Sequence, residues 1–197
     1  METEIEAKFT DINQTELRAK LQTIGATLQH PERLMRRKVF DYPDERLYGE
    51  GAWIRVRDEG DKITLSFKKL LDRSLHGTKE ITITVNNFDE TCNLLQAMGL
   101  ISKSYQETKR ETWIFDDCEI TIDTWPWIPE LAEIEASSEE KVRDVAQKLG
   151  FDWADALHGS VETAYQKHYD VTDQEIDSWS EILFTPVPDW LEIKRKI

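Results

Sequence analysis

The chain has 197 residues and a formal net charge of −14, with 39% hydrophobic and 10% aromatic residues. This length can bury one good hydrophobic core, so we expect one domain followed by a tail. The net negative charge argues against non-specific binding to nucleic acid or to anionic membranes, because both would be repelled.

The sequence gives two indications of the compartment. It contains no run of the roughly 18 apolar residues that a membrane span needs, and residues 1–4 are acidic where a signal peptide would be basic and then apolar. Cys92 and Cys118 have neither the spacing of metal ligands nor the density of a disulfide framework. We therefore expect a cytoplasmic protein in which both cysteines are ordinary thiols.

The first half of the chain predicts a strand, a helix and then several strands. Charged and apolar residues alternate over residues 4–9, which is typical of a strand with one polar face. Leucines at helical spacing predict a helix from Thr15, and Gly25 follows as a stop signal. Further strands are expected at residues 33–41, 52–58, 62–68 and 78–85, with a tight turn at Gly60 between the second and third of these.

The second half repeats this pattern. A helix is predicted from Asp89, interpreted as its N-cap, to Gly99. Strands at residues 108–115, 119–124 and 131–136 follow, then a helix at residues 138–149 that stops at Gly150. Three large aromatic residues and two prolines lie beyond Asp170. The domain is therefore expected to cover residues 1–170, and residues 171–197 are expected to form a C-terminal tail that packs on it.

About eight strands with alternating faces favour a closed barrel, because closure removes the exposed edges of an open sheet. The three predicted helices could cover the apolar faces of these strands from outside. We therefore predict an α+β fold: a closed antiparallel eight-stranded β-barrel, or tunnel, with a polar interior and helices on its outside.

Carboxylates recur on the polar faces of the predicted strands. Glu4 and Glu6 share one face of the first strand, Glu133 and Glu135 share a face of the last, and Asp123 has the inward phase of the strand between. Five carboxylates in one barrel would repel each other unless cations lie among them. Oxygen ligands of this kind suit Mg²⁺ or Mn²⁺.

Cations recur on the same faces. They are Lys8, Arg55, Arg57, Lys68 and Arg110. Guanidinium groups bind phosphate oxygens bidentately, and lysine supplies a compact point charge. Because a linear triphosphate carries enough negative charge to need both a metal and several cations, the interior is interpreted as a triphosphate site.

The order of these motifs over residues 2–170 resembles the CYTH superfamily, the triphosphate tunnel metalloenzymes. The motifs are Glu4-x-Glu6-x-Lys8, Arg55-x-Arg57, Lys68, Glu80, Arg110-x-x-Trp113, Asp123 and Glu133-x-Glu135. The superfamily includes class IV adenylyl cyclases, thiamine triphosphatases and inorganic tripolyphosphatases.

The resemblance implies roles for most of these residues. The implied ligands of Mg²⁺ or Mn²⁺, or groups that position water, are Glu4, Glu6, Asp123, Glu133 and Glu135. The implied phosphate ligands are Lys8, Arg55, Arg57, Lys68 and Arg110, and the residues expected to act in catalysis are Glu4, Glu6, Lys8 and Arg57.

The chain departs from the superfamily pattern at two places. Where many relatives have Arg-x-Glu-x-Glu, residues 78–82 read Thr-x-Glu-x-Thr, and Ala164 replaces a lysine that many relatives have before a tyrosine. Lys167 is a candidate replacement for that lysine. On the strand at residues 33–41, either Arg37 or the pair of residues on its two sides faces inward and supplies another cation.

Three functions follow as hypotheses. The favoured one is metal-dependent hydrolysis of inorganic tripolyphosphate, thiamine triphosphate or a nucleoside triphosphate. The alternatives are an adenylyl cyclase that converts ATP to cyclic AMP and pyrophosphate, and a module that binds a triphosphate or polyphosphate without cleaving it.

The tryptophans of residues 125–129 either stack on a nucleobase or thiamine ring or pack around their own loop. The expected partner is a small-molecule triphosphate, and the chain is expected to be a monomer or a homodimer.

Overall fold

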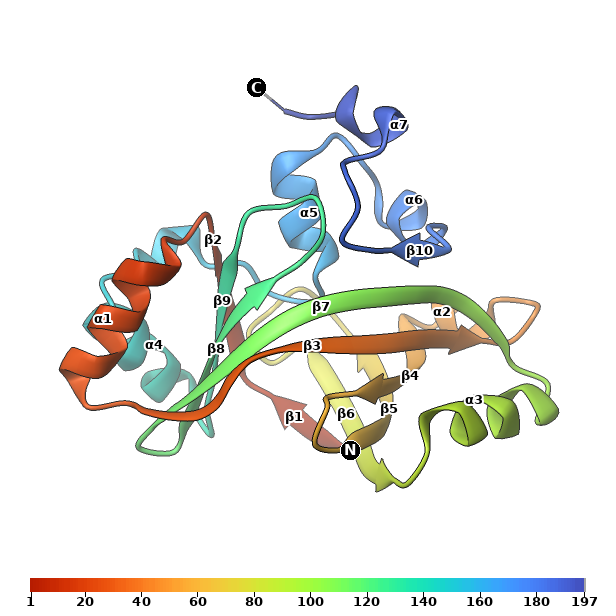
Figure 1. Ribbon diagram of the computed structural model, residues 1–197, viewed down its shortest axis with the longest axis horizontal. Coiled ribbons are helices and arrows are strands. Elements are labelled where there is room, and N and C mark those ends of the chain that lie inside the picture. Colours follow the sequence, from red (N-terminus) through yellow and green to blue (C-terminus); the bar gives the residue numbers. More distant parts are fainter. Residues whose placement is uncertain (197) are drawn as a thin grey trace.

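The computed structural model describes residues 1–196, so Ile197 of the expected tail lies outside the described residues. Its strands form one ten-stranded sheet with the order β1-β6-β5-β4-β3-β7-β8-β9-β2, and β10 pairs with β7 (Figure 1). The strands are β1 (Glu2–Glu4), β2 (Glu6–Thr10), β3 (Thr27–Asp41), β4 (Ala52–Asp58), β5 (Ile63–Leu70), β6 (Thr78–Val85), β7 (Ile101–Phe115), β8 (Cys118–Thr124), β9 (Leu131–Glu135) and β10 (Glu181–Ile182).

The N-terminal segment closes this sheet into a barrel. β1 pairs antiparallel with β6, and β2, which follows after Ile5, pairs antiparallel with β9 at the opposite end of the strand order. When β1 and β2 are counted as one bent strand, the barrel has the eight antiparallel strands that the sequence predicts. The short β10 runs parallel to β7 and lies outside this ring. The predicted α+β antiparallel barrel is therefore confirmed.

Two strands are longer than predicted. β3 and β7 pair along nearly their whole lengths, from Thr27 opposite Ile114 to Asp41 opposite Ile101. Their register shifts between Leu28 and Arg33, where the sequence also contains a proline. Such irregularities interrupt the period of two, so the sequence pattern predicts only the regular parts of both strands.

Side-chain caps begin the three longer helices. In α1 (Gln14–Ile24), the Asn13 side chain accepts hydrogen bonds from two backbone N–H groups, and Gly25 ends the helix at a φ of 85°. α3 (Phe88–Ala97) begins after Asn87, whose side chain accepts from the N–H of Glu90. The prediction of Asp89 as N-cap was wrong, because the competing asparagine two residues earlier makes the capping bond. α4 (Glu139–Lys148) is capped by Ser138.

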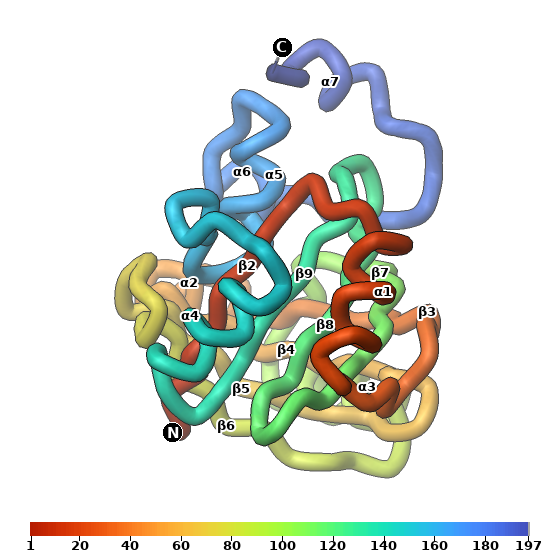
Figure 2. Tube along the Cα trace, turned by 90° about the vertical axis from the view of Figure 1, so that its left-hand side faces the viewer, coloured from red at the N-terminus to blue at the C-terminus, as the bar shows by residue number. Residues whose placement is uncertain are grey.

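These helices cover the apolar outside of the barrel. α1 and α4 lie on the side formed by β2, β8 and β9 (Figure 2). There Leu21 and Val142, both fully buried, pack with Ile120 and Ile134 of the sheet. On another side, α3 packs on β3 and β4. Since the apolar faces of these strands point outward to the helices, their polar faces line the interior.

The segment after Asp170 packs around the loop between β8 and β9. It contains α6 (Asp173–Asp177) and α7 (Asp189–Glu192), and it follows α5 (Glu162–His168). Trp179 packs edge-on against Trp127 and Tyr165 in one apolar cluster. The tryptophans of this loop therefore contact the C-terminal segment, which favours the packing interpretation over stacking on a ligand ring.

The remaining short helices are α2 (Arg46–Gly49), between β3 and β4, and a 3-10 turn (Trp153–Asp155) after α4. Within residues 1–196, no helix combines the length and the apolar composition required to cross a membrane.

Burial of α1 against the barrel should contribute strongly to stability. Leu21 is fully buried, whereas Leu94 on α3 is 60% exposed. We expect Leu21→Ala to lower the free energy of unfolding by about 2–5 kcal/mol, because it removes buried apolar contacts and leaves a cavity. The matched Leu94→Ala change should cost less than about 0.5 kcal/mol. Urea unfolding curves measure both, and equal effects would contradict this packing.

Candidate functional site

The barrel interior contains a cavity of about 1170 Å³. Most of the predicted site residues line it, namely Glu4, Glu6, Lys8, Arg37, Arg55, Arg57, Lys68, Arg110, Glu133 and Glu135. They come from β1, β2, β3, β4, β5, β7 and β9, so the strands bring together side chains that are distant in the sequence. The inward phase expected for each of these side chains agrees with its place on the cavity wall.

Three glutamates lie side by side on this wall. Glu6 of β2 is opposite Glu135 of β9, which is in turn opposite Glu119 of β8. Glu119 was not among the predicted site residues, although it also lines the cavity. A signal for it was present in the sequence, because Glu119 and Asp123 are four residues apart on one strand and so share a face.

Two carboxyl groups of the wall have raised pKa values. Burial, together with the neighbouring Glu6 and Glu119, raises the pKa of Glu135 to about 7. Burial and a hydrogen bond with Glu80 raise the pKa of Glu4 to about 8, although Lys68 opposes this. One buried oxygen of Glu4, Oε2, has no hydrogen-bond partner among the described residues. A cation bound beside Glu4 and Glu135 would relieve the repulsion between these carboxylates and the neighbouring glutamates.

Two lysines already lie between carboxylates. The Nζ atom of Lys8 is 2.5 Å from Glu6 and 3.6 Å from Glu133, and Lys8 is only 3% exposed. Lys68 lies 2.8 Å from Glu4 and 3.1 Å from Glu80. Burial alone would lower the pKa of Lys8, but Glu6 and Glu133 raise it. Lys8 is therefore held charged inside the cavity.

Arg110 joins two strands through their carboxylates. Its Nε and Nη2 atoms donate to the two oxygens of Asp123 at 2.6 and 2.5 Å, and Nη2 also donates to Glu133 at 2.5 Å. Asp123 is 1% exposed and does not line the cavity. The structure thus places this predicted metal ligand behind Arg110, where it positions the guanidinium group.

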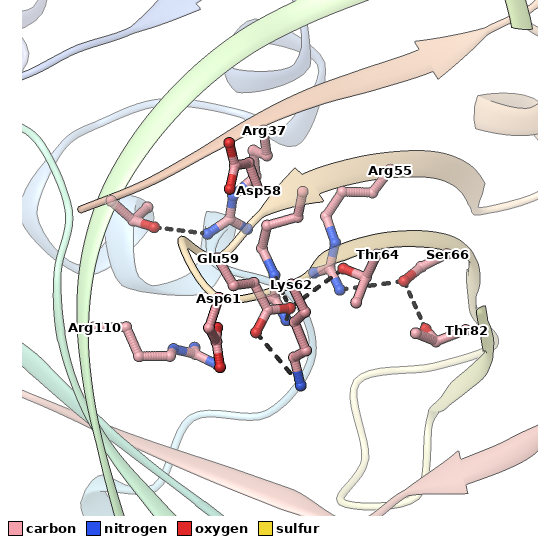
Figure 3. A network of polar contacts seen from close by, with 12 residues as sticks. Arg37, Arg55, Asp58, Glu59, Asp61, Lys62, Thr64, Ser66, Thr82 and Arg110 are labelled. Atoms are coloured by element: carbon pink, nitrogen blue, oxygen red, sulfur yellow. Dashed lines mark hydrogen bonds and ion pairs between the residues drawn. The ribbon is translucent and has the colours of Figure 1, made fainter. Parts of the chain in front are cut away.

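Arg37 and Arg55, which Figure 3 labels, each have one buried donor that no group within residues 1–196 accepts. The Nε atom of each is buried without a hydrogen-bond partner among the described residues. Arg37 donates from Nη2 to Thr108 at 3.1 Å and lies over the ring of Trp125. Burial and neighbouring arginines lower the pKa of Arg37, and they lower that of Arg55 to about 10. These two guanidinium groups are suited to an anion.

The neighbouring cation on β3 faces away from this site. Arg36 donates to Asp58 at 3.1 Å and has a side chain that is 45% exposed. Of the two strand phases that the sequence left open, the structure therefore selects Arg37 as the inward cation.

Lys167 does not line the cavity and is removed from the phosphate candidates. It lies on α5 with a side chain that is 40% exposed, and its ammonium group contacts Thr10 and Asp11. The reason is helical geometry: Tyr165 is fully buried, and a residue two positions later on a helix points roughly to the opposite side.

The carboxylates of the wall are chemically suited to a divalent metal, but their side chains are not yet gathered around one point. Among residues 1–196, no three Asp, Glu, His or Cys side chains converge closely enough to hold a metal ion by themselves. Lys8 and Lys68 instead occupy positions between the carboxylates. The row of Glu6, Glu135 and Glu119, together with the unpartnered oxygen of Glu4, supplies the hard oxygen donors that Mg²⁺ or Mn²⁺ prefer.

A further acidic group lies on the cavity wall near α5 and α6. Burial, together with the neighbouring Asp177 and Asp173, raises the pKa of Glu162 to about 7. A carboxyl group with a higher pKa in the folded chain than its ordinary 4.5 binds its proton more tightly when folded. Glu162 therefore lowers the free energy of unfolding progressively as the pH rises from about 4.5 to about 7.

We expect Glu162→Gln to reduce this loss of stability, because glutamine carries no proton that must be released. The measurement is the free energy of unfolding of both proteins at pH 5 and at pH 8. Glu139→Gln is the control, because Glu139 lies on the surface and its pKa is lowered by Arg143. An unchanged pH dependence in Glu162→Gln would contradict the assignment.

Solved structures share this architecture. A proposed adenylate cyclase from Vibrio parahaemolyticus superimposes with a TM-score of 0.73 at 16% identity, covering 84% of this chain and 98% of that one. PH1012 from Pyrococcus horikoshii gives 0.66 at 19% identity, covering 78% and 93% of the two chains. HpAC1 from Hippeastrum, a proposed adenylyl cyclase with a dominant triphosphatase activity, gives 0.58 at 12% identity, covering 88% and 94%.

At these identities the structures show that the fold is shared. No curated protein matches the sequence significantly. The CYTH domain family, however, matches residues 2–169, which include every strand of the closed barrel and all of the residues described above on its wall from Glu4 to Glu162. The chain therefore belongs to the CYTH family.

Proposed function

We propose that this protein is a divalent-metal-dependent triphosphatase, which hydrolyses a small-molecule triphosphate inside the barrel. The observation that carries the proposal is the imbalance of charge within one cavity. Arg37 and Arg55 have buried donors without partners in the part of the chain that the structure describes, while Glu4 and Glu135 have raised pKa values. A triphosphate and a divalent cation together would satisfy both groups. The expected substrates are inorganic tripolyphosphate, thiamine triphosphate and nucleoside triphosphates.

The cations of the wall would bind and orient the phosphate chain. Arg37 and Arg55 have N–H groups free to donate to phosphate oxygens, and Lys8 and Lys68 add point charges. Asp123 holds the guanidinium group of Arg110 in place, so this group needs little rearrangement during the reaction. In phosphoryl transfer, positioning and charge stabilisation of this kind supply most of the catalysis.

The carboxylates would hold the metal and the water. Glu4, Glu6 and Glu135 are the residues proposed to hold Mg²⁺ or Mn²⁺, with Glu119 beside them. When bound there, the metal would supply Lewis acidity toward the phosphate oxygens. Lys8 and Arg110 outweigh burial and lower the pKa of Glu133, so this group stays ionised and can accept a hydrogen bond from the attacking water.

The surroundings of Trp125, beside the arginines of the cavity, favour hydrolysis over cyclisation. A cyclase needs a pocket for the base, and Trp125, which lies beside Arg37, is 5% exposed because it packs against Tyr165. Its ring is therefore occupied by protein contacts. The resulting proposal depends on phosphate contacts rather than on recognition of a nucleoside.

The proposal predicts metal-dependent product formation. With Mg²⁺ or Mn²⁺, tripolyphosphate, thiamine triphosphate or ATP should release orthophosphate. Glu4→Gln and Glu135→Gln should each lower kcat by about 100-fold or more, because each removes charge that balances the metal. Glu139→Gln, on the outside of α4, is the control and should retain activity.

Other products would lead to different conclusions. Cyclic AMP and pyrophosphate from ATP would establish the cyclase in place of the triphosphatase. If no substrate gives a metal-dependent product, the catalytic proposal fails and a triphosphate-binding barrel remains.

Arg37 supplies a second prediction. Replacing it by methionine keeps an apolar stem over Trp125 but removes the charged donors, and a hydrogen bond to a charged group contributes about 1.5–3 kcal/mol. We therefore expect Arg37→Met to raise KM by roughly 10- to 100-fold. Arg36→Met is the matched control on the outer face and should change KM less than about twofold. Steady-state kinetics that show equal effects would contradict the inward assignment of Arg37.

A further inference from the structure

One edge of the barrel sheet lacks a partner strand over part of its length. β6 lies between β5 and β1, but β1 pairs only with residues 78–80 of it, where Glu2 lies opposite Glu80 (Figure 1). Within residues 1–196, the backbone of residues 81–85 makes no hydrogen bond outside the ladder with β5. Because the backbone groups of a strand point to both of its sides, this stretch presents a row of unpaired N–H and C=O groups.

The unpaired stretch has none of the residues that usually protect an exposed edge. Proteins place charged side chains or proline on such edges, because these prevent pairing with a further strand. Residues 81–85 read Ile-Thr-Ile-Thr-Val, without charge or proline, although the chain as a whole has a net charge of −14. The charged Lys79 and Glu80 lie in the part that β1 already covers. The composition of the stretch therefore favours pairing with another strand.

The outer face of this edge is apolar. Ile81 and Ile83 are 51% and 54% exposed, and they lie opposite Phe67 and Leu65 of β5. Helices α1 and α4 cover β2, β8 and β9, and α3 covers β3 and β4. An exposed apolar surface therefore adjoins the row of unpaired backbone groups.

The inner face of the same stretch carries hydroxyl groups. Thr82 lines the cavity and shares a hydrogen bond of 2.6 Å with Ser66 of β5 (Figure 3). Thr84, two residues further along the strand, faces the same way and lies opposite Thr64. The two faces of the edge thus differ in polarity, and a partner strand must match both.

The stretch matches itself when two copies run antiparallel. A two-fold axis at Ile83 places Ile81 opposite Val85 of the second copy and Thr82 opposite Thr84 of the second copy. Directly opposed residues of an antiparallel pair lie on the same face, so apolar side chains meet apolar ones and hydroxyl groups meet hydroxyl groups. A register shifted by one residue would place Ile83 opposite Thr84, which joins an apolar face to a polar one.

The length of the free edge also fits a second copy. β6 ends at Val85, and β1 begins at Glu2, opposite Glu80, so five positions are free and the second copy supplies five residues. Met1 precedes β1 and is 58% exposed, so it has room to move aside. Because Leu65 lies beside Ile83, the pairing would continue the outer apolar rows of both copies across the joint.

We propose that residues 81–85 of β6 pair antiparallel with the same residues of a second copy of this chain, which joins two barrels into a dimer. The partner is a second copy rather than a strand of another protein, because the stretch is complementary to itself on both faces. Five residues from each strand form a small interface, so the dimer is weak and depends on protein concentration. The inference is independent of the reaction in the cavity.

The first test is the oligomeric state, measured by sedimentation equilibrium from about 1 to about 200 μM protein. The parent chain should shift from monomer to dimer over this range. Ile83→Lys should weaken the dimer by at least about tenfold, because two ammonium groups would meet at the two-fold axis. Ile193→Lys is the matched control, because Ile193 is 84% exposed at the end of α7, and it should change dimerisation less than about twofold.

The alternative outcomes of this test overturn the proposal. A chain that remains monomeric throughout the range leaves the edge to a strand of another protein. A dimer that Ile83→Lys and Ile193→Lys affect equally forms through a different surface.

A second test depends on register and uses no charged substitution. Ile83→Cys places two thiols at directly opposed positions, where the Cα atoms lie about 4.5–5.5 Å apart and fit a disulfide. Ile81→Cys is the control, because its two thiols would lie about 14 Å apart. After oxidation, a non-reducing gel should show a covalent dimer for Ile83→Cys alone, since the native Cys92 and Cys118 are buried. No covalent dimer from Ile83→Cys, or equal amounts from both variants, would overturn the pairing.

Discussion

The closure of the barrel by the N-terminal segment is the constraint on which the rest of the structure depends. β1 pairs with β6 and β2 pairs with β9, so nine residues of chain join the two ends of the sheet. The same segment carries Glu4, Glu6 and Lys8. Closure therefore creates the cavity and brings two of its acidic groups, Glu4 and Glu6, to the wall in one step. It also requires the apolar outer faces of the strands to be covered, which α1, α3 and α4 do through their buried side chains.

The cavity formed in this way contains charges that only partly neutralise each other. Lys8, Lys68 and Arg110 bind carboxylates directly, and these pairs give the wall a defined geometry. Arg37 retains a donor that has no partner among residues 1–196, and Glu135 shares its surroundings with two other glutamates. Buried charges without partners cost free energy, and proteins tolerate that cost mainly at functional sites. The proposed triphosphate and metal are the ligands that would satisfy both kinds of group at once.

The sequence predicted most of the fold and most residues of the cavity wall, because a strand places alternate side chains on one face. It could not distinguish a side chain that faces the cavity from one held behind a partner, which is why the bond between Arg110 and Asp123 was not foreseen. Glu119 was missed although its phase matched that of Asp123, and Lys167 was misplaced because its segment is a helix. The hydrogen bonds from Arg57 to Glu59 depend on how the turn after β4 folds back, which no period in the sequence encodes.

The most direct test of the central claim is whether a triphosphate and a divalent metal bind together. Diimidotriphosphate, which resists hydrolysis, would be titrated into the protein by calorimetry with and without Mg²⁺. The account predicts one site per chain and an affinity that rises at least about tenfold with Mg²⁺, because the cation relieves the repulsion at Glu4 and Glu135 while binding the phosphate oxygens. Binding that is independent of Mg²⁺, or weaker in its presence, would contradict the account.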